Sequence, residues 1–320
     1  MKLITSLALL AALAGCESSK SRLDTVAAKD KPAHAAEPAP SPTPPPSAAL
    51  KIDRSGSVED QLKRLQDAYD RNVEVLDLLN KELAQQKAQQ AAQERDVPDP
   101  DAMFAVNVAV DIKAGQVDGP ASAPVTIVKA FDFACPFCQR VVGTMKELVK
   151  EYDGKVRVVY ANMLVHPPAK PAHLASCAAA KQGKYMAFKD AFWDKGFGPY
   201  SASGGQDTAK LGEDNILAIA KDLGLDTTKL KADMHSPECE ARIETDLQEF
   251  TKFHVNATPT FFINGRVIDG AQPKETFKKV IDEQLRLAEA SGVPGAEYYD
   301  KVVLAKGEKQ FRSKMDPKPN

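Results

Sequence analysis

Apolar residues recur with a helical rhythm over residues 57–94, a segment that contains no glycine or proline. They follow alternating steps of four and three positions, which is the a/d pattern of a coiled coil. The seam consists of Val58, Leu62, Leu65, Tyr69, Asn72, Leu76, Leu79 and Leu83. Beyond it only Gln86 and Gln90 continue the pattern, so packing should fade there. We predict an amphipathic helix over residues 56–96.

This helix has two possible roles. It could lie on a neighbouring domain with its apolar stripe buried, or it could self-associate as a coiled coil. We favour self-association, because the segment Val-Pro-Asp-Pro-Asp-Ala at 97–102 separates the helix from the next patterned region. The seam does not distinguish a dimer from a trimer.

A different pattern begins at Phe104 and predicts a β-α-β unit. A β-rich run at 123–128 is followed by a helix at 139–152, whose apolar residues share one face, and by a second β-rich run at 155–164. Two cysteines lie where the first strand meets the helix. Residues 172–255 are mostly helical by pattern, with a loop predicted at 198–207.

A hairpin signal follows the helical region. The apolar strand Thr260–Ile263, an Asn264-Gly265 turn and a second strand at 266–268 predict an antiparallel pair. A helix closes this α/β domain, which we place at 104–292. The tail at 293–320 is expected to add a short helix before a polar end.

Composition adds a tether and excludes one class of partner. The net charge of -2 and the isoelectric point near 6.3 give no reason to expect nucleic-acid binding. Seven of the 22 prolines fall between Lys31 and Ser47. Residues 16–55 contain no aromatic side chain and cannot bury a core, so we predict a semi-extended tether.

The first residues are typical of an exported protein. An apolar run from Leu3 to Leu13 follows a single lysine and predicts a signal peptide at 1–15. Leu13-Ala14-Gly15-Cys16 resembles the bacterial lipobox, which implies a lipid on Cys16 and anchoring to a membrane surface. An ordinary cleaved signal, with Cys16 incidental, is the alternative. Glu17 favours the outer over the inner membrane by the same resemblance.

The pair in Cys135-Pro136-Phe137-Cys138 carries the candidate chemistry. A cysteine at a helix start is stabilised as a thiolate by unpaired N–H groups, and proline suits the first helical position. Cys135 is therefore the expected nucleophile and Cys138, nearly one turn later, the resolving thiol. A zinc site would need further ligands, for which His166 and His173 are the nearest candidates, and we disfavour it. We expect no metal and no cofactor.

Two stretches together, ASAPVTIVKAFDFACPFC and NATPTFFINGR, resemble the signatures of bacterial DsbA-like thiol:disulfide oxidoreductases. The resemblance covers residues 104–292 and implies a thioredoxin fold with a helical insertion at about 172–255. It implies that Pro259 is a cis-proline facing the cysteine pair and that Thr258 offers its backbone to substrate. Thr258, Pro259, Pro136 and Phe137 are the expected substrate contacts.

The chain departs from that family at Lys129, where many members carry glutamate. A carboxylate there would accept the proton of the resolving thiol, whereas an ammonium group could favour a thiolate. Lys129 could equally turn towards solvent, and we leave it out of the catalytic set. Asp132 is the family's usual residue, and we expect it to orient the turn.

Cys177 and Cys239 remain for a second pair. Some DsbA-like proteins have a disulfide between the corresponding helices, and an exported compartment favours one here. Two unpaired buried thiols are the alternative.

The predicted function is protein thiol:disulfide exchange in the cell envelope, with the chain lipid-anchored and facing the periplasm. The partners would be cysteine-containing client proteins, a redox partner that recycles the dithiol, the membrane, and further copies of the chain through residues 57–94. The direction of electron flow stays open: an oligomeric disulfide isomerase is the first alternative. A non-catalytic envelope scaffold or holdase is the second.

Overall fold

The computed structural model describes residues 53–318. The chain forms two compact units, residues 1–73 and 74–320, whose boundary falls within a long helix. The predicted signal peptide at 1–15, Cys16 and most of the tether at 16–55 lie outside the described residues.

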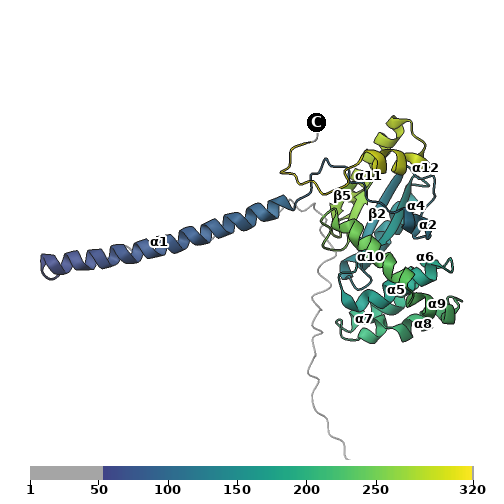
Figure 1. Cartoon of the computed structure of the whole chain (residues 1–320), viewed down its shortest axis with the longest axis horizontal. Coiled ribbons are helices and arrows are strands. Elements are labelled where there is room, and N and C mark those ends of the chain that lie inside the picture. Colours follow the sequence, from purple (N-terminus) through teal and green to yellow (C-terminus); the bar gives the residue numbers. More distant parts are fainter. Residues whose placement is uncertain (1–52, 319–320) are drawn as a thin grey trace, which may run out of the picture. The chain divides into compact units, whose positions relative to one another are not determined.

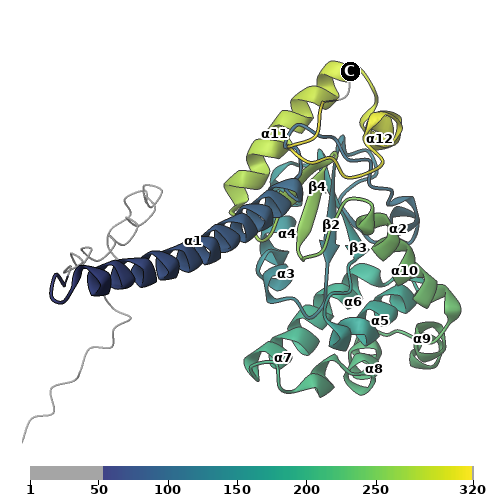
Figure 2. The ribbon, with the colours of Figure 1, turned by 60° about the vertical axis from the view of Figure 1, so that its left-hand side comes forward.

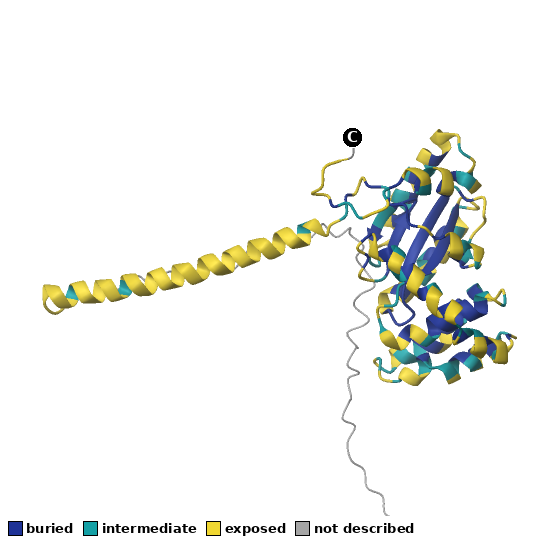
Figure 3. Cartoon of the chain, in the orientation of Figure 1, coloured by how far each residue is buried: buried dark blue, intermediate teal, exposed yellow. Residues whose placement is uncertain are grey.

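Helix α1, Val58–Arg95, has the predicted length and buries none of its residues. Its first turn is closed by reciprocal hydrogen bonds: Ser57 Oγ accepts from Asp60 N–H, and Asp60 Oδ2 accepts from Ser57 N–H, which is a capping arrangement. The seam residues are exposed along the whole helix (Figure 3), from 82% for Val58 to 49% for Leu83. The apolar stripe is therefore exposed along the helix.

The globular unit is built on a five-stranded sheet of order β1-β3-β2-β4-β5 (Figure 1). Its strands are β1 Val117–Asp118, β2 Val125–Phe131, β3 Val156–Asn162, β4 Thr260–Ile263 and β5 Arg266–Asp269. Strands β2 and β3 are parallel, and the other pairs are antiparallel. The predicted β-α-β unit and the β4–β5 hairpin are confirmed.

Helices cover both faces of the sheet, with α4 and α11 on one side and α2 and α10 on the other (Figure 2). Successive side chains of a strand point to opposite faces, so the side chains of β2 pack in two cores, one on each face of the sheet. Ile127 packs with Met145 of α4 and Phe277 of α11, whereas Val128 belongs to a core with Phe250 of α10. These helices are α2 Ala109–Lys113, α4 Val142–Glu151, α10 Pro237–Thr251 and α11 Lys274–Ser291.

The helical insertion lies between β3 and β4 and begins near the expected residue. Its helices before α10 are α5 Lys170–Ala180, α6 Tyr185–Phe192, α7 Gly198–Ala202, α8 Glu213–Asp222 and α9 Thr227–Met234. Short 3-10 turns cover Pro167–Ala169 and Thr208–Leu211, and a π-helical turn covers Trp193–Phe197.

The loop predicted at 198–207 is wrong in its first half, because helix α7 occupies Gly198–Ala202. The Gly198-Pro199 pair looks like a helix breaker in sequence. Proline is nevertheless tolerated in a first helical turn, where its missing N–H costs nothing. Tyr200 packs on the ring of Phe197 with centroids 6.1 Å apart, which holds this turn against the insertion core.

The C-terminal segment contributes α12, Gly295–Tyr298, and a π-helical stretch, Tyr299–Leu304. Tyr299 is buried and its hydroxyl donates to the carbonyl of Val106 at 2.8 Å. The expected short helix of the tail is therefore present and packs under the sheet.

Candidate active site

The cysteine pair begins helix α3, Pro136–Arg140, directly after β2. Cys135 is the N-terminal capping residue, with extended backbone angles, and Pro136 occupies the start of the helix. The backbone N–H of Cys138 donates to Cys135 Sγ at 3.4 Å. The buried strand β2 thus places Cys135 at the N-terminus of α3, where backbone N–H groups point at its sulfur.

The two sulfurs are unpaired in this structure and differ sharply in acidity. The hydrogen bond from the Cys138 thiol is the largest cause that lowers the pKa of Cys135 to about 5, and backbone N–H groups lower it further against partial burial. Burial raises the pKa of Cys138 well above its ordinary value. At neutral pH the site therefore offers one thiolate backed by one thiol.

The strand β4 brings Thr258 and Pro259 to the cysteine pair. Thr260 pairs with Ala130 of β2, so the segment before β4 lies beside the turn after β2. The thiol of Cys135 donates to the carbonyl oxygen of Thr258 at 3.2 Å, and the Thr258–Pro259 peptide bond is cis. Residues more than 120 positions apart are joined here by strand pairing.

Phe137 and Pro136 form the exposed side of the site. The Phe137 ring is 49% exposed, and the guanidinium of Arg140 lies 4.8 Å from its centroid. Pro136 is also exposed. An exposed aromatic ring beside a reactive sulfur gives an apolar surface for a chain that approaches Cys135.

Asp132 orients the turn that carries Cys135. Its fully buried carboxylate accepts hydrogen bonds from the N–H groups of Ala134, Val165 and His166 at 2.6–2.7 Å. These bonds tie the residues before α3 to the loop after β3. The sequence suggested the role in the turn, but not the link to residues 165–166.

Lys129 is buried, 1% exposed, and its ammonium donates to the carbonyl oxygen of Cys138 at 3.2 Å. The alternative in which this side chain reaches solvent is therefore wrong. All seven residues of β2 are buried because helices and neighbouring strands cover both of its faces. A long, nearly continuous apolar strand was the sequence signal for this outcome.

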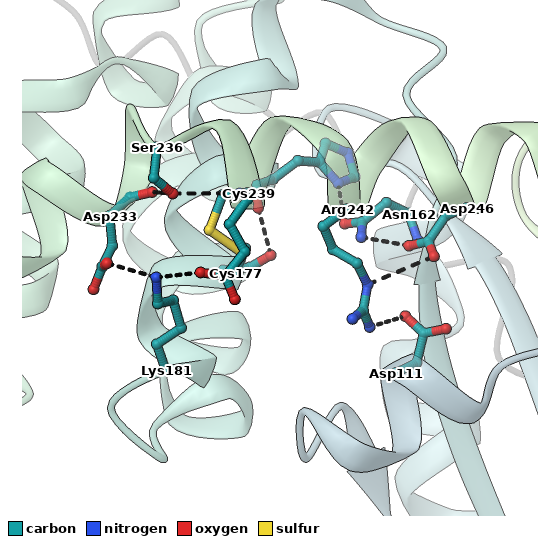
Figure 4. Close-up of a disulfide and its surroundings, with 12 residues drawn as sticks. Asp111, Asn162, Cys177, Lys181, Asp233, Ser236, Cys239, Arg242 and Asp246 are labelled. Atoms are coloured by element: carbon teal, nitrogen blue, oxygen red, sulfur yellow. Dashed lines mark hydrogen bonds and ion pairs between the residues drawn. A yellow bond between two sulfur atoms is a disulfide. The ribbon is translucent and has the colours of Figure 1, made fainter.

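The structure joins Cys177 of α5 to Cys239 of α10 by a disulfide, the pairing that the resemblance implied (Figure 4). Lys181 adds ion pairs to Asp233 and Glu238 at 2.7 Å. The start of the insertion and its final helix are thus connected at one end.

A buried polar chain continues along α10 from this disulfide (Figure 4). Arg242 pairs with Asp111 at 2.6 Å, and Asp246 accepts from the side chain of Asn162 at 2.6 Å. These contacts anchor α10 to α2 and β3, and none of them was apparent from the sequence.

The two histidines considered for zinc serve other contacts. His173 is buried and its Nδ1 lies 2.8 Å from Asn162 Oδ1, while His166 Nδ1 lies 3.2 Å from Asp132. Over residues 53–318 the structure contains no group of three or more potential ligands that could hold a metal ion.

Comparison with known proteins now identifies the family. A family model described as Thioredoxin matches residues 112–283, more than half of the chain. The chain belongs to the thioredoxin family, and the predicted α/β fold with a preceding long helix is confirmed.

Two curated relatives match the chain over a minor part of their own length. A protein named Na(+)/H(+) antiporter NhaA of Herminiimonas arsenicoxydans is 29% identical over 185 residues, which are 58% of this chain and 28% of that protein. NhaA 3 of Salinispora tropica is 33% identical over 162 residues, 50% and 23% of the two chains. The chain thus spans about a quarter of these relatives. Among the residues that the structure describes, no helix is both long and apolar enough to cross a membrane.

Three of the solved structures that are similar to the chain follow. A thioredoxin-like oxidoreductase of Silicibacter pomeroyi is 30% identical, with a TM-score of 0.43, over 53% of this chain and 91% of its own. Oxidised BdbD of Bacillus subtilis is 24% identical, with a TM-score of 0.45, over 55% and 95%. Alpha-DsbA1 of Wolbachia pipientis is 19% identical, with a TM-score of 0.47, over 55% and 93%.

Proposed function

We propose that the protein is a thiol:disulfide oxidoreductase that exchanges the Cys135–Cys138 pair with cysteines of client proteins. The observation that carries this proposal is the contrast between two sulfurs in one helical turn. Cys135 is acidic, with a pKa of about 5, and Cys138 is buried, with its pKa raised. A thiolate that attacks and a shielded thiol that resolves the mixed disulfide are what exchange requires.

The position of Thr258 supports a protein substrate. Its carbonyl oxygen accepts a hydrogen bond from Cys135 only in the thiol form and is therefore free when Cys135 is a thiolate, and its hydroxyl has no partner although it is buried. An extended client segment that pairs with this backbone would replace the contact and bring its own cysteine to Cys135 Sγ. Pro136 and Phe137 would contact the same segment from the side of α3.

The Cys177–Cys239 disulfide supports an exported location, because structural disulfides persist in oxidising compartments such as the periplasm. We accordingly retain the signal peptide at 1–15 and the lipid on Cys16. The lipid would tether the protein to the periplasmic face of a membrane, the outer one by preference.

The exposed seam of α1 supports self-association. Leu76 and Leu79 are 58% and 53% exposed, and neighbouring Val73 and Val75 widen the stripe. An oligomer would remove these side chains from water and present several active sites to one client, which favours isomerase activity as the second candidate. In sedimentation, Leu76→Asp with Leu79→Asp should give monomers. The control Leu78→Asp, equally exposed but off the seam, should keep the wild-type mass, and equal masses for all three proteins would contradict the coiled coil.

The proposed chemistry is tested with two matched cysteine variants and a client that contains several disulfides. Cys138→Ser should accumulate a mixed disulfide between Cys135 and the client, because resolution is blocked, and Cys135→Ser should form none. Oxidation of the reduced client, and reshuffling of a scrambled one, should both be lost in Cys135→Ser.

If the protein is instead a scaffold or holdase, the opposite result is expected for Cys135→Ser. There, Cys135→Ser would still support client folding, and deletion of residues 57–94 would abolish it. The equilibrium reduction potential of the 135–138 pair against glutathione then separates an oxidase from an isomerase or a reductase.

A further inference from the structure

Lys129 is a buried ammonium group whose position next to the cysteine pair the exchange chemistry above does not explain. Its Nζ contacts the carbonyl oxygen of Cys138 at 3.2 Å. No carboxylate in residues 53–318 lies within ion-pair distance of it. The other fully buried lysine, Lys189, shows the usual arrangement, because it pairs with Asp190 at 2.7 Å.

The surroundings of Lys129 offer little to offset a charge. The rings of Phe131, Tyr160 and Phe261 surround Nζ at 5.9–6.0 Å, near the outer limit of cation–π attraction. An ammonium group in such a site is costly unless an anion is close.

The titratable groups that face Lys129 come from three elements. They are the two cysteines at α3, Lys189 on α6 with its partner Asp190, and the hydroxyl of Tyr160 on β3. The pKa of Lys129 is lowered to about 8, chiefly by burial and also by the charge of Lys189, while Cys138 and Cys135 act to raise it. Only the cysteine sulfurs can supply a negative charge that vanishes when they form a disulfide.

We propose that Lys129 is a redox-linked proton site: it holds its proton while the cysteine pair is reduced and releases it when the pair becomes a disulfide. The inference rests on the proposed exchange at Cys135 and Cys138 and deepens it. Lys129 acts through the charge of the sulfurs and is therefore a positioning residue.

The proton and electron balance is as follows. A client thiolate attacks Cys135 Sγ, the bond between Cys135 and Cys138 breaks, and its electron pair stays on Cys138 Sγ. The proton that this client thiol has lost reaches Cys138, which becomes a thiol, while Lys129 is still a neutral amine. A second client thiol then loses its proton, attacks the first client sulfur and releases Cys135 as a thiolate. Lys129 takes up this second proton as an ammonium group beside the new anion, so the two client protons end on Cys138 and Lys129.

The proposal predicts how strongly the redox equilibrium depends on pH. Reduction takes up one proton at Cys138, and each proton taken up changes the equilibrium constant tenfold per pH unit. A redox-linked proton on Lys129 makes the change steeper than tenfold per unit near pH 7–8, the region of its pKa of about 8. If Lys129 has the same protonation state in the reduced and disulfide forms, the equilibrium constant changes only tenfold per pH unit.

The test equilibrates the full-length protein with glutathione at several pH values and traps the thiols by alkylation. Peptide mass spectrometry then reads the 135–138 pair separately from the 177–239 disulfide. After correction for glutathione's own ionisation, the wild type should exceed tenfold per unit and Lys129→Met should not. At pH 7 the variant should also favour the disulfide about tenfold more, the lower end of what a nearby opposite charge does.

Lys189→Met is the matched control, because it removes an equally buried lysine that pairs with a carboxylate. This variant should keep a pH dependence of the redox equilibrium steeper than tenfold per unit. The steep region should move to higher pH, because the charge of Lys189 lowers the pKa of Lys129 in the wild type. A wild-type dependence of tenfold per unit overturns the proposal without any variant, so poor folding of Lys129→Met leaves the test intact. Glutathione equilibrates the pair chemically, so this result is independent of whether client exchange itself is observed.

Discussion

The ionisation of Cys135 can be measured directly and follows from named contacts. Its hydrogen bond with the Cys138 thiol is the largest cause that lowers its pKa from 9.0 to about 5. At pH 7 a thiol with a pKa of about 5 is about 99% ionised, and one with a pKa of about 9 is about 1% ionised. The reduced protein should therefore carry about a hundred times more thiolate at this position than an unperturbed cysteine would.

The same pKa shift determines how the folding stability of the reduced protein changes with pH. A depressed folded-state pKa contributes stability that is complete above pH 9.0, the ordinary value, and is lost as pH falls through about 5. Between these values the folding equilibrium of the reduced protein should become about tenfold more favourable for each pH unit. The form with a 135–138 disulfide lacks this contribution, because its sulfurs do not titrate.

Two variants separate the contributions to the shift. Cys138→Ala removes the thiol that bonds to Cys135 but keeps the backbone N–H at 3.4 Å, so the pKa of Cys135 should rise and still stay below 9.0. Cys138→Ser keeps a hydroxyl donor, so the pKa of Cys135 in this variant should lie between its values in Cys138→Ala and in the wild type.

The assay is the ultraviolet absorbance of the thiolate as a function of pH, together with the rate of alkylation by iodoacetamide. Cys135→Ser is the control and should show no transition in the acidic range, because Cys177 and Cys239 remain bonded. A wild-type midpoint near 9, or equal midpoints for the wild type and Cys138→Ala, would refute the account of the site.

Three further changes test the framework around the site. Replacing Cys177 and Cys239 together by alanine should lower the free energy of unfolding by up to about 4 kcal/mol, because the disulfide spans 62 residues. Denaturant titration measures this free energy, and a loss below about 1 kcal/mol would contradict the prediction. Asp132→Ala leaves the buried N–H of Ala134 without an acceptor and should cost about 1–3 kcal/mol, with slower alkylation of the cysteine it positions. Asn264→Ala should cost a similar amount, because its side chain bonds two backbone groups and its φ is 44°. Asn264→Asp keeps the acceptor for Thr126 but loses the donor to Pro124 and buries a charge, so it should cost at least as much.

The local chemistry of the site could be predicted from sequence because it depends on neighbouring residues. A cysteine followed by proline at a strand-to-helix junction defines a helix N-terminus. The Cys138 thiol, nearly one turn later, and the backbone N–H groups of this terminus make Cys135 the acidic sulfur. The Asn264-Gly265 turn specified a hairpin in the same way, since Asn264 and Gly265 adopt φ values of 44° and 86° that few other residues accept. The heptad rhythm of α1 likewise needs only local spacing.

What the sequence could not supply are the contacts between residues far apart in the chain. A lysine within a β-rich run has a side chain long enough to reach water, and only the covering of β2 on both faces decided that Lys129 stays inside. The Asp132 carboxylate accepts hydrogen bonds from N–H groups 33 and 34 residues away, and Arg242 pairs with Asp111 across 131 residues. Such pairings depend on strand order and helix packing, which satisfy buried polar groups wherever the fold brings them together. Sequence alone thus determined which sulfur is reactive, and tertiary structure decided which charge lies beside its partner.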